Sequence, residues 1–142
     1  MIRFCDIVFS LLALLTLLPV FFLVACILRF TGEGEVFFIQ RRVGTKGKCF
    51  GIVKFATMLK NSPNLGAGTI TIDRDPRILP VGRILRQTKI NELPQLWNVI
   101  IGDMIIIGPR PQTRECFNAF NAVARRQLIR IRPGLSGIGS II

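Results

Sequence analysis

The chain has no histidine, no tyrosine and a single tryptophan among its 142 residues. The lack of histidine excludes Ser-His and Cys-His nucleophile systems, so any catalysis must use carboxylates, lysine, hydroxyl groups or metal-bound groups. The four cysteines never lie two to four residues apart, which argues against a zinc site or a disulfide framework. We therefore expect reduced, structural thiols at Cys5, Cys26, Cys49 and Cys116.

Acidic residues are also scarce: 8 Asp and Glu stand against 19 Lys and Arg, for a formal net charge of +11. Such a basic chain is attracted to anionic lipid headgroups or to nucleic acid. The cations are scattered along the sequence, and no DNA-binding or RNA-binding motif is present. Because the chain also has no Tyr and a single Trp, we expect no nucleic-acid partner.

Charge is missing altogether from Ile7 to Leu28. At about 1.5 Å per residue, a helix of this length can cross the ~30 Å hydrocarbon core of a membrane. Pro19 lies in the middle of the segment and favours a kink, and Arg3 and Arg29 place positive charge at both ends. We therefore predict a re-entrant helix with both ends on the cytoplasmic side, in preference to a straight span or a buried helix of a soluble protein.

A cleaved lipoprotein signal is a further interpretation of the same segment, because Leu23-Val24-Ala25-Cys26 resembles a lipoprotein cleavage site. The match is weak. Asp6 interrupts the basic amino-terminal region, and the apolar region is longer than that of a signal peptide and contains a proline.

Residues 32–142 are the right length for one small domain with a single core. Two apolar runs around a Gly-rich turn predict a hairpin, at Val36–Gln40 and Phe50–Met58. Helical spacing of apolar residues predicts three helices, at Arg77–Gln87, Asn91–Ile101 and Gln112–Ile131, and an isoleucine run predicts a buried strand at Ile105–Ile107. Asp75 and Asn91 are expected to cap the first two helices. A polar loop is expected at 61–68, and the short segments 69–72 and 138–142 are left unassigned.

The segment from Leu85 to Pro111 contains the residue types that phosphoryl transfer requires. Its carboxylates, Glu92 and Asp103, suit a divalent cation, and its basic residues suit phosphate oxygens. Two prolines stiffen the turn that presents Arg110. The pair Asn91-Glu92 is equally consistent with an ordinary helix start.

Several sequence strings have the order and spacing of a known family. They are F-F-I-Q-R-R-V-G, K-F-A-T-M, L-R-Q-T-K-I-N-E-L-P-Q-L-W-N-V-I-I-G-D-M, G-P-R-P and I-R-P-G-L-S-G. In these strings the chain resembles the monotopic phosphoglycosyl transferases among the bacterial sugar transferases, and the likeness extends over nearly the whole chain. The resemblance implies an α/β membrane-associated fold: a re-entrant membrane helix over residues 1–31, then a cytoplasmic domain of amphipathic helices and short strands over 32–142.

The resemblance also implies an activity, the transfer of a phosphosugar from a UDP-sugar to polyprenyl phosphate. This is the first membrane step of bacterial glycoconjugate or exopolysaccharide synthesis, at the cytoplasmic face of the inner membrane. The implied cofactor is Mg²⁺, and the implied partners are membrane lipid, polyprenyl phosphate and the nucleotide-sugar. A homodimer is left open.

By the same resemblance, Asn91 and Glu92 occupy the catalytic positions, and Glu92 is assigned to Mg²⁺ or to proton handling. Arg86 and Arg110, with Lys54 as a weaker candidate, are assigned to phosphate oxygens. Asn91 stands where the family has an aspartate nucleophile, and an amide cannot attack phosphorus as a carboxylate does. Direct attack by the lipid phosphate is one interpretation. An inactive protein that binds sugar nucleotide or lipid phosphate is another, and a basic membrane-surface scaffold is a third.

Overall fold

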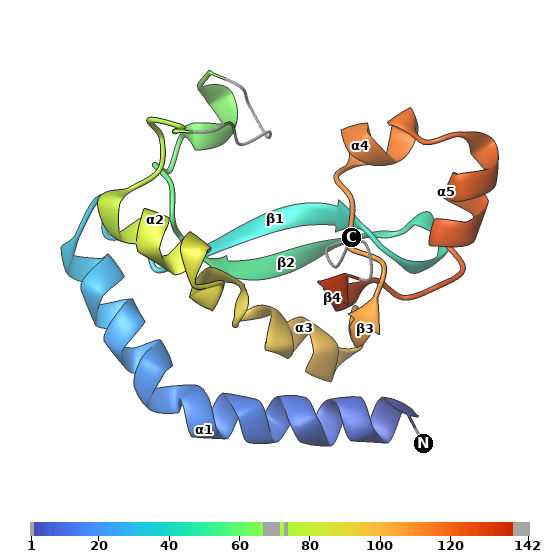
Figure 1. The fold of residues 1–142 in the computed structure, drawn as a ribbon, viewed down its shortest axis with the longest axis horizontal. Helices are drawn as coiled ribbons and strands as arrows, with labels where there is room; N and C mark the ends of the chain where they lie inside the picture. Colours follow the sequence, from blue (N-terminus) through green and yellow to red (C-terminus); the bar gives the residue numbers. More distant parts are fainter. Residues whose placement is uncertain (1, 67–71, 73, 138–142) are drawn as a thin grey trace. The chain divides into compact units, whose positions relative to one another are not determined.

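The computed structural model describes residues 2–66, 72 and 74–137. Helices and short strands alternate along the chain, as expected for an α/β fold (Figure 1). The α-helices are α1 (Ile2–Phe30), α2 (Pro80–Gln87), α3 (Gln95–Ile101), α4 (Arg114–Ala119) and α5 (Ala122–Leu128). The strands are β1 (Phe37–Val43), β2 (Cys49–Phe55), β3 (Ile105–Gly108) and β4 (Gly134–Gly137). The short segments left unassigned at 69–71 and 138–142 lie outside the described residues.

The residues group into two compact units, and each unit takes part of α1. Unit 1 comprises Met1–Thr16, Ile39–Val53 and Gln95–Ile142, and unit 2 comprises Leu17–Phe38 and Lys54–Pro94. The boundary expected between residues 31 and 32 stays a prediction. All four cysteines are free thiols, as expected.

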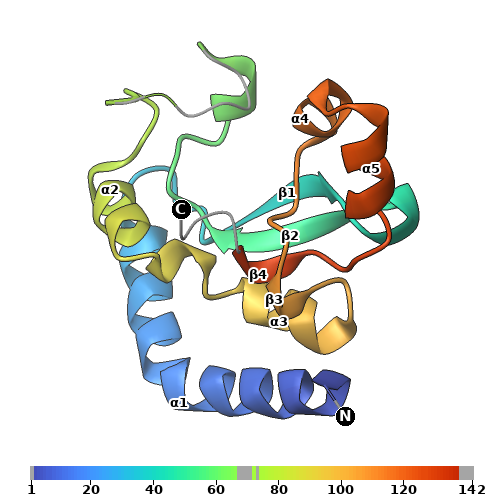
Figure 2. The same ribbon diagram turned by 45° about the vertical axis from the view of Figure 1, so that its right-hand side comes forward.

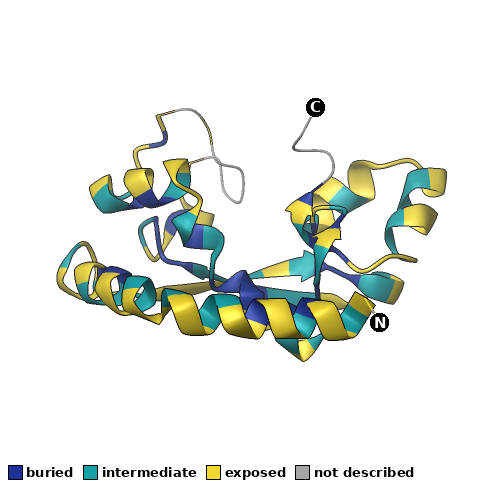
Figure 3. Ribbon diagram, turned by 60° about the horizontal axis from the view of Figure 1, so that its bottom comes forward, coloured by how far each residue is buried: buried dark blue, intermediate teal, exposed yellow. Residues whose placement is uncertain are grey.

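The long helix α1 confirms the apolar helix expected from the sequence, and it continues through Pro19. Its most apolar window has a mean hydropathy of 2.9, yet only 11% of that window is buried. Figure 3 shows exposed residues along most of the helix. By length and composition α1 can cross a membrane. Large apolar surfaces left uncovered by protein are typical of membrane or partner contacts.

In unit 1, α3 packs against β2. Fully buried apolar residues form the core there: Ile52, Val99 and Met104. The buried amide of Asn98 donates from Nδ2 to the Gly51 carbonyl (2.8 Å) and accepts the Val53 N–H at Oδ1 (3.0 Å). The side chain therefore bonds the β2 backbone as a neighbouring strand would, and this satisfies both polar ends of the amide inside the core.

Arg3 ties the first part of α1 to the end of α3. Its Nη1 donates to the Val99 carbonyl (2.5 Å) and its Nη2 to the Ile100 carbonyl (2.8 Å). The last carbonyls of a helix have no partners within the helix and carry partial negative charge, so a guanidinium satisfies both needs. The amino-terminal part of the apolar helix is thereby attached to α3 of unit 1.

In unit 2, the second part of α1 shares a core with β2 and α2. The buried members are Val24, Leu28, Phe55 and Leu85. The Phe55 ring stacks on Phe37, with ring centroids 5.4 Å apart, and is tilted against Phe21 at 5.3 Å. Such aromatic pairs contribute about 0.5–1.5 kcal/mol beyond the burial of their area. Part of α1 is therefore a core helix of this unit.

The predicted hairpin is confirmed, with shifted bounds. β1 and β2 form a two-stranded sheet and are joined by the 3₁₀ turn η1 (Thr45–Gly47). β1 extends past the predicted end at Gln40 to Val43, and β2 ends at Phe55 rather than Met58. A second 3₁₀ turn, η2 (Ser62–Asn64), lies within the predicted polar loop.

All three predicted helices were wrong in extent. The helix expected at Asn91–Ile101 begins at Gln95, after a separate 3₁₀ turn over Ile90–Glu92. The helix expected at Arg77 begins at Pro80, because Asp75 binds the Arg77 backbone and side chain instead of capping a helix. The helix expected over 112–131 is two helices, α4 and α5. They are separated because Phe120 is extended (ψ 149°) and the Asn121 side chain accepts the Ala124 N–H, which starts α5 anew.

β3 and β4 pair in parallel, and Figures 1 and 2 both show them side by side. The strand expected at 105–107 is confirmed, but its description as buried was wrong, since the Ile107 side chain is exposed. Gly108 and Gly134 meet backbone to backbone: a Cβ on Gly134 would lie 2.1 Å from the Gly108 nitrogen. Only glycine fits this contact, which closes unit 1 at the base of the Gly-Pro-Arg-Pro turn.

Replacing Gly134 by alanine should therefore destabilise the chain. The added methyl group overlaps backbone atoms that cannot rotate away, and we expect a loss of at least about 2 kcal/mol. Thermal unfolding in detergent measures the effect, with Ser136→Ala on the same strand as the control, because Ser136 is exposed. Equal unfolding midpoints for the two variants would contradict the close β3–β4 contact.

Candidate functional site

Four of the five residues predicted for the site lie in unit 2: Lys54, Arg86, Asn91 and Glu92. The fifth, Arg110, belongs to unit 1. Lys54 is half-buried near the end of β2, and Arg86 is half-buried in the last turn of α2. The 3₁₀ turn η3 (Ile90–Glu92) follows α2 and carries the other two. The structure thus brings two cations, an amide and a carboxylate together in one unit.

Arg86 is held against the segment that follows β2. Its Nε donates to Thr57 Oγ1 (3.0 Å), and its Nη2 lies 3.8 Å from Met58 Sδ. Burial lowers the pKa of the guanidinium, and the negative charges of Asp75 and Glu92 oppose that shift. Arginine stays protonated across the physiological range, so Arg86 is a partly desolvated cation whose attraction for anions is strengthened by its surroundings.

The contact between Arg86 and Thr57 depends on a close approach by α2. A Cβ on Gly82 would lie 2.2 Å from the Thr57 carbonyl oxygen, so only glycine allows α2 to come this near. The same carbonyl accepts the Leu79 N–H (2.9 Å) at the start of the helix. Sequence reasoning missed Thr57, although it lies in the K-F-A-T-M string used for the resemblance.

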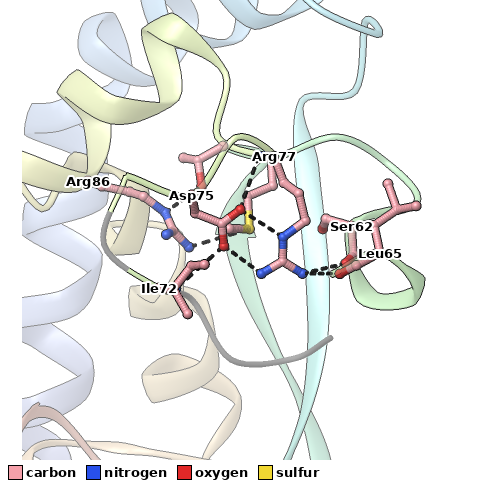
Figure 4. A network of polar contacts seen from close by, with 8 residues as sticks. Ser62, Leu65, Ile72, Asp75, Arg77 and Arg86 are labelled. Carbon is pink, nitrogen blue, oxygen red and sulfur yellow. Dashed lines mark hydrogen bonds and ion pairs between the residues drawn. The ribbon is translucent and has the colours of Figure 1, made fainter. Parts of the chain in front are cut away.

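A buried ion pair lies beside Arg86 (Figure 4). Asp75 accepts from Arg77 Nε at Oδ1 (2.8 Å) and from Nη2 at Oδ2 (2.5 Å), and both side chains are almost fully buried. Arg77 Nη1 also donates to the carbonyls of Ser62 (2.7 Å) and Leu65 (2.8 Å). A bidentate arginine–carboxylate pair of this kind fixes the orientation of both side chains as well as compensating their charges. It joins the 62–65 segment to the segment that leads into α2.

Asn91 lies inside η3 and does not cap a helix, so that expectation was wrong. The turn instead begins at Lys89, whose backbone is left-handed (φ 63°). The Asn91 side chain is 6% exposed, and its Oδ1 has no hydrogen-bond partner among the described residues. A buried acceptor without a partner is costly and often marks a place where a ligand, an ion or water binds. The strained left-handed backbone of Lys89 begins the turn that carries the Asn91 side chain.

Glu92 is half-buried on the same turn, one residue beyond the amide. Its charge acts on Arg86, so a cation and an anion are coupled across the loop between α2 and η3. Among the described residues there is no group of three or more His, Cys, Asp or Glu that could hold a metal by itself. The donor set of Glu92 and Asn91 Oδ1 fits an ion that takes its remaining ligands from phosphate oxygens and water, as Mg²⁺ does.

Arg110 is presented by the turn between β3 and α4. Its side chain is exposed, and its backbone carbonyl accepts from Gln112 Nε2 (3.0 Å). The turn borders a small hollow in unit 1 lined by three prolines, Phe117 and Leu128. Because the Arg110 guanidinium is exposed, it avoids the desolvation penalty of a buried cation. Its planar fork of N–H donors suits phosphate oxygens.

A profile of the family described as "Bacterial sugar transferase" matches residues 1–142. The exopolysaccharide production protein ExoY of Sinorhizobium fredii (strain NBRC 101917 / NGR234) is 35% identical over 98% of the chain and 67% of its own length. A protein of Aeromonas hydrophila named UDP-N-acetylgalactosamine-undecaprenyl-phosphate N-acetylgalactosaminephosphotransferase is 36% identical over 99% of the chain and 33% of its own length.

A third relative is the UDP-glucose:undecaprenyl-phosphate glucose-1-phosphate transferase of Escherichia coli (strain K12). It is 36% identical over 96% of the chain and 30% of its own length. The chain therefore spans about a third to two thirds of the length of each of these relatives. Their names are those of transferases and a polysaccharide production protein, and none supports an inactive binding protein.

The Asp75–Arg77 pair predicts a pH dependence of the stability of the chain. The Arg77 hydrogen bonds hold the pKa of the Asp75 carboxyl well below its usual range. A lowered folded-state pKa stabilises the chain above the unfolded pKa of about 4, and this contribution is lost as the pH falls towards the folded value. We expect Asp75→Asn to lower the unfolding midpoint at pH 7, and its difference from the parent to shrink progressively below about pH 4.

Thermal unfolding at a series of pH values between 3 and 7 checks this, with Asp103→Asn as the control. Asp103 makes no ion pair among the described residues, so its replacement should leave the pH profile of the parent in place. A parent–Asp75→Asn difference that stays constant down to pH 3 would show that the ion pair does not form.

Proposed function

Because the chain belongs to the bacterial sugar transferase family, we propose that it transfers a sugar 1-phosphate from a UDP-sugar to a polyprenyl phosphate such as undecaprenyl phosphate. The observation that carries this proposal is the cluster in unit 2, where the partly desolvated Arg86 is coupled to Glu92 beside the orphaned Asn91 amide oxygen. Such a cluster suits anionic phosphates rather than a neutral ligand. The product would be the first lipid-linked intermediate of an exopolysaccharide.

The basic groups bind and orient the substrate. In unit 2, Arg86 holds oxygens of the diphosphate, with Lys54 as a second cation. In unit 1, Arg110 presents its guanidinium to phosphate oxygens from a stiff turn. The charge that develops on the departing nucleotide in the transition state is stabilised by cations that are already in place. Little reorganisation is then needed at the moment of transfer.

Asn91 favours direct attack by the lipid phosphate. An amide cannot act as the phosphorus nucleophile. In the proposed step, an oxygen of the polyprenyl phosphate bonds to the phosphorus that carries the sugar, and the bond from that phosphorus to the UMP oxygen breaks. The neutral Asn91 side chain does not repel the incoming anion, and its Nδ2 group can donate a hydrogen bond to it.

Mg²⁺ is the cofactor that this proposal implies. Glu92 and the Asn91 Oδ1 atom would hold it together with substrate phosphate oxygens, because these are oxygen donors of the kind the ion prefers. The ion, when bound, would neutralise charge on the diphosphate. Glu92 and the neighbouring cations then fix the orientation of the diphosphate within unit 2.

The helix α1 would place this chemistry at the cytoplasmic face of the bacterial cytoplasmic membrane, as a re-entrant, monotopic segment. Three features support this. Most of α1 is apolar and exposed, Arg3 is tied to α3, and Val24 and Leu28 belong to the core of unit 2. A straight span would carry one end of α1 away from the parts of the chain it contacts.

The re-entrant arrangement predicts that both ends of α1 are cytoplasmic. We propose single-cysteine variants at Ile2 and Phe30, which are 80% and 87% exposed, in an otherwise cysteine-free chain in bacterial cells. A membrane-impermeant maleimide should label neither in intact spheroplasts and both in inverted vesicles. A chain retaining only Cys116, exposed in α4, is the cytoplasmic reference. Labelling of one end in spheroplasts would establish a straight span.

Replacing Asn91 by aspartate tests the route of transfer. The parent should release UMP from a UDP-sugar only when polyprenyl phosphate is present. Asn91→Asp restores a carboxylate nucleophile, so turnover should rise, and a phosphosugar adduct should form on residue 91 when the lipid is withheld. Intact mass and peptide mapping detect the adduct, and Asn91→Ala is the matched control without a nucleophile. An adduct on the parent chain would exclude direct attack by the lipid phosphate.

A further inference from the structure

Arg42 is a half-buried arginine next to the end of β1 that the proposed reaction does not use. Its Nη1 donates to the Pro111 carbonyl (3.2 Å), and its Nη2 donates to Gln40 Oε1 (2.7 Å). All three residues belong to unit 1. One guanidinium therefore joins a strand to the carbonyl that directly follows Arg110 in the chain.

The rest of the turn is fixed by backbone contacts from both sides. The Val43 N–H donates to the Gln112 carbonyl (2.9 Å), and the Gly134 N–H donates to the Pro109 carbonyl (2.8 Å). With Arg42 bound to Pro111, the backbone carbonyls before and after Arg110 both accept hydrogen bonds. The bond from Arg42 comes from a side chain, whereas the other two come from the backbone. It can therefore be removed by substitution without breaking the β3–β4 contact.

We propose that Arg42 is a positioning residue, which holds the Pro111 carbonyl and so sets the direction in which Arg110 presents its guanidinium to the nucleotide diphosphate. This rests on the proposed function of Arg110. The arginine fork suits the task because it reaches Gln40 and Pro111 at once, and Gln40 in turn fixes the fork. Fixing the turn before binding lowers the entropy lost when the diphosphate is bound.

The alternative role for Arg42 is direct attraction of the diphosphate by its charge. The two roles differ in their coupling to Arg110. A positioning residue loses its effect when Arg110 is absent, because it has nothing left to orient, whereas a second binding cation keeps its effect. The neighbouring Arg41 provides a matched control. It is exposed, and it points to the opposite face of the strand.

A double-mutant cycle on the full chain in detergent tests the proposal, with UDP and MgCl₂ as the titrated ligands in calorimetry. We expect Arg42→Met to weaken UDP binding about tenfold in the parent, on the scale of one hydrogen bond to a charged group. In the Arg110→Ala background the same substitution should change the affinity less than twofold. Arg41→Met should leave it unchanged in both backgrounds. If Arg42→Met does not fold, Gln40→Ala replaces it in the cycle, because it removes the hydrogen bond that holds the Arg42 guanidinium.

Each outcome decides between the roles. Equal weakening by Arg42→Met in both backgrounds would overturn positioning and make Arg42 a second binding cation. An unchanged affinity in Arg42→Met, with Arg110→Ala weakened, would overturn the proposal and leave the proposed function intact. If Arg110→Ala binds UDP as the parent does, or if the parent binds no UDP, the proposed function of Arg110 fails and the positioning role fails with it.

Discussion

The attachment of a long apolar helix to the rest of the chain is the constraint on which this structure depends. α1 leaves most of its apolar surface uncovered, but Arg3 binds the end of α3, and Val24 and Leu28 complete the core of unit 2. Removing the helix would expose that core and leave the α3 carbonyls without their guanidinium partner. The apolar helix and the folding of the rest of the chain are therefore not separable. Under the proposed function, a site held by such a helix stays close to its lipid substrate.

The candidate site combines partial burial of charge with compensation by neighbouring charges. Burying Arg86 alone would be unfavourable, and Asp75, Glu92 and the Thr57 hydroxyl offset that cost. The orphaned oxygen of Asn91 is the one uncompensated acceptor of the cluster among the described residues of unit 2. Its need for a partner and the excess of cations both favour an anionic ligand that arrives with a metal ion.

The sequence predicts the elements better than it predicts their ends. The apolar helix, the hairpin and β3 follow from local patterns. Arg86 and Glu92 were predicted as site residues from the chemistry and spacing of one segment, and both lie in unit 2. The late start of α2 and the Asp75–Arg77 pair were not identified, because they depend on partners such as Ser62 and Leu65 that only folding brings near. The break between α4 and α5 could have been predicted from the sequence, because asparagine is a preferred capping residue and Asn121 begins α5. Arg42 gave no signal of its own, because its partner Pro111 lies far along the chain.

The central claim is that the phosphate next to the sugar moves together with the sugar to the lipid. It is tested most directly with a panel of UDP-sugars that carry ³²P in the β-phosphate and ¹⁴C in the sugar, each incubated with the chain, Mg²⁺ and undecaprenyl phosphate in detergent. The account predicts that, with at least one of these sugars, both labels enter the lipid fraction in a one-to-one ratio, with unlabelled UMP as the other product. Carbon label in the lipid without ³²P would show transfer of the sugar alone, and a lipid fraction without either label for every sugar would contradict the assigned activity.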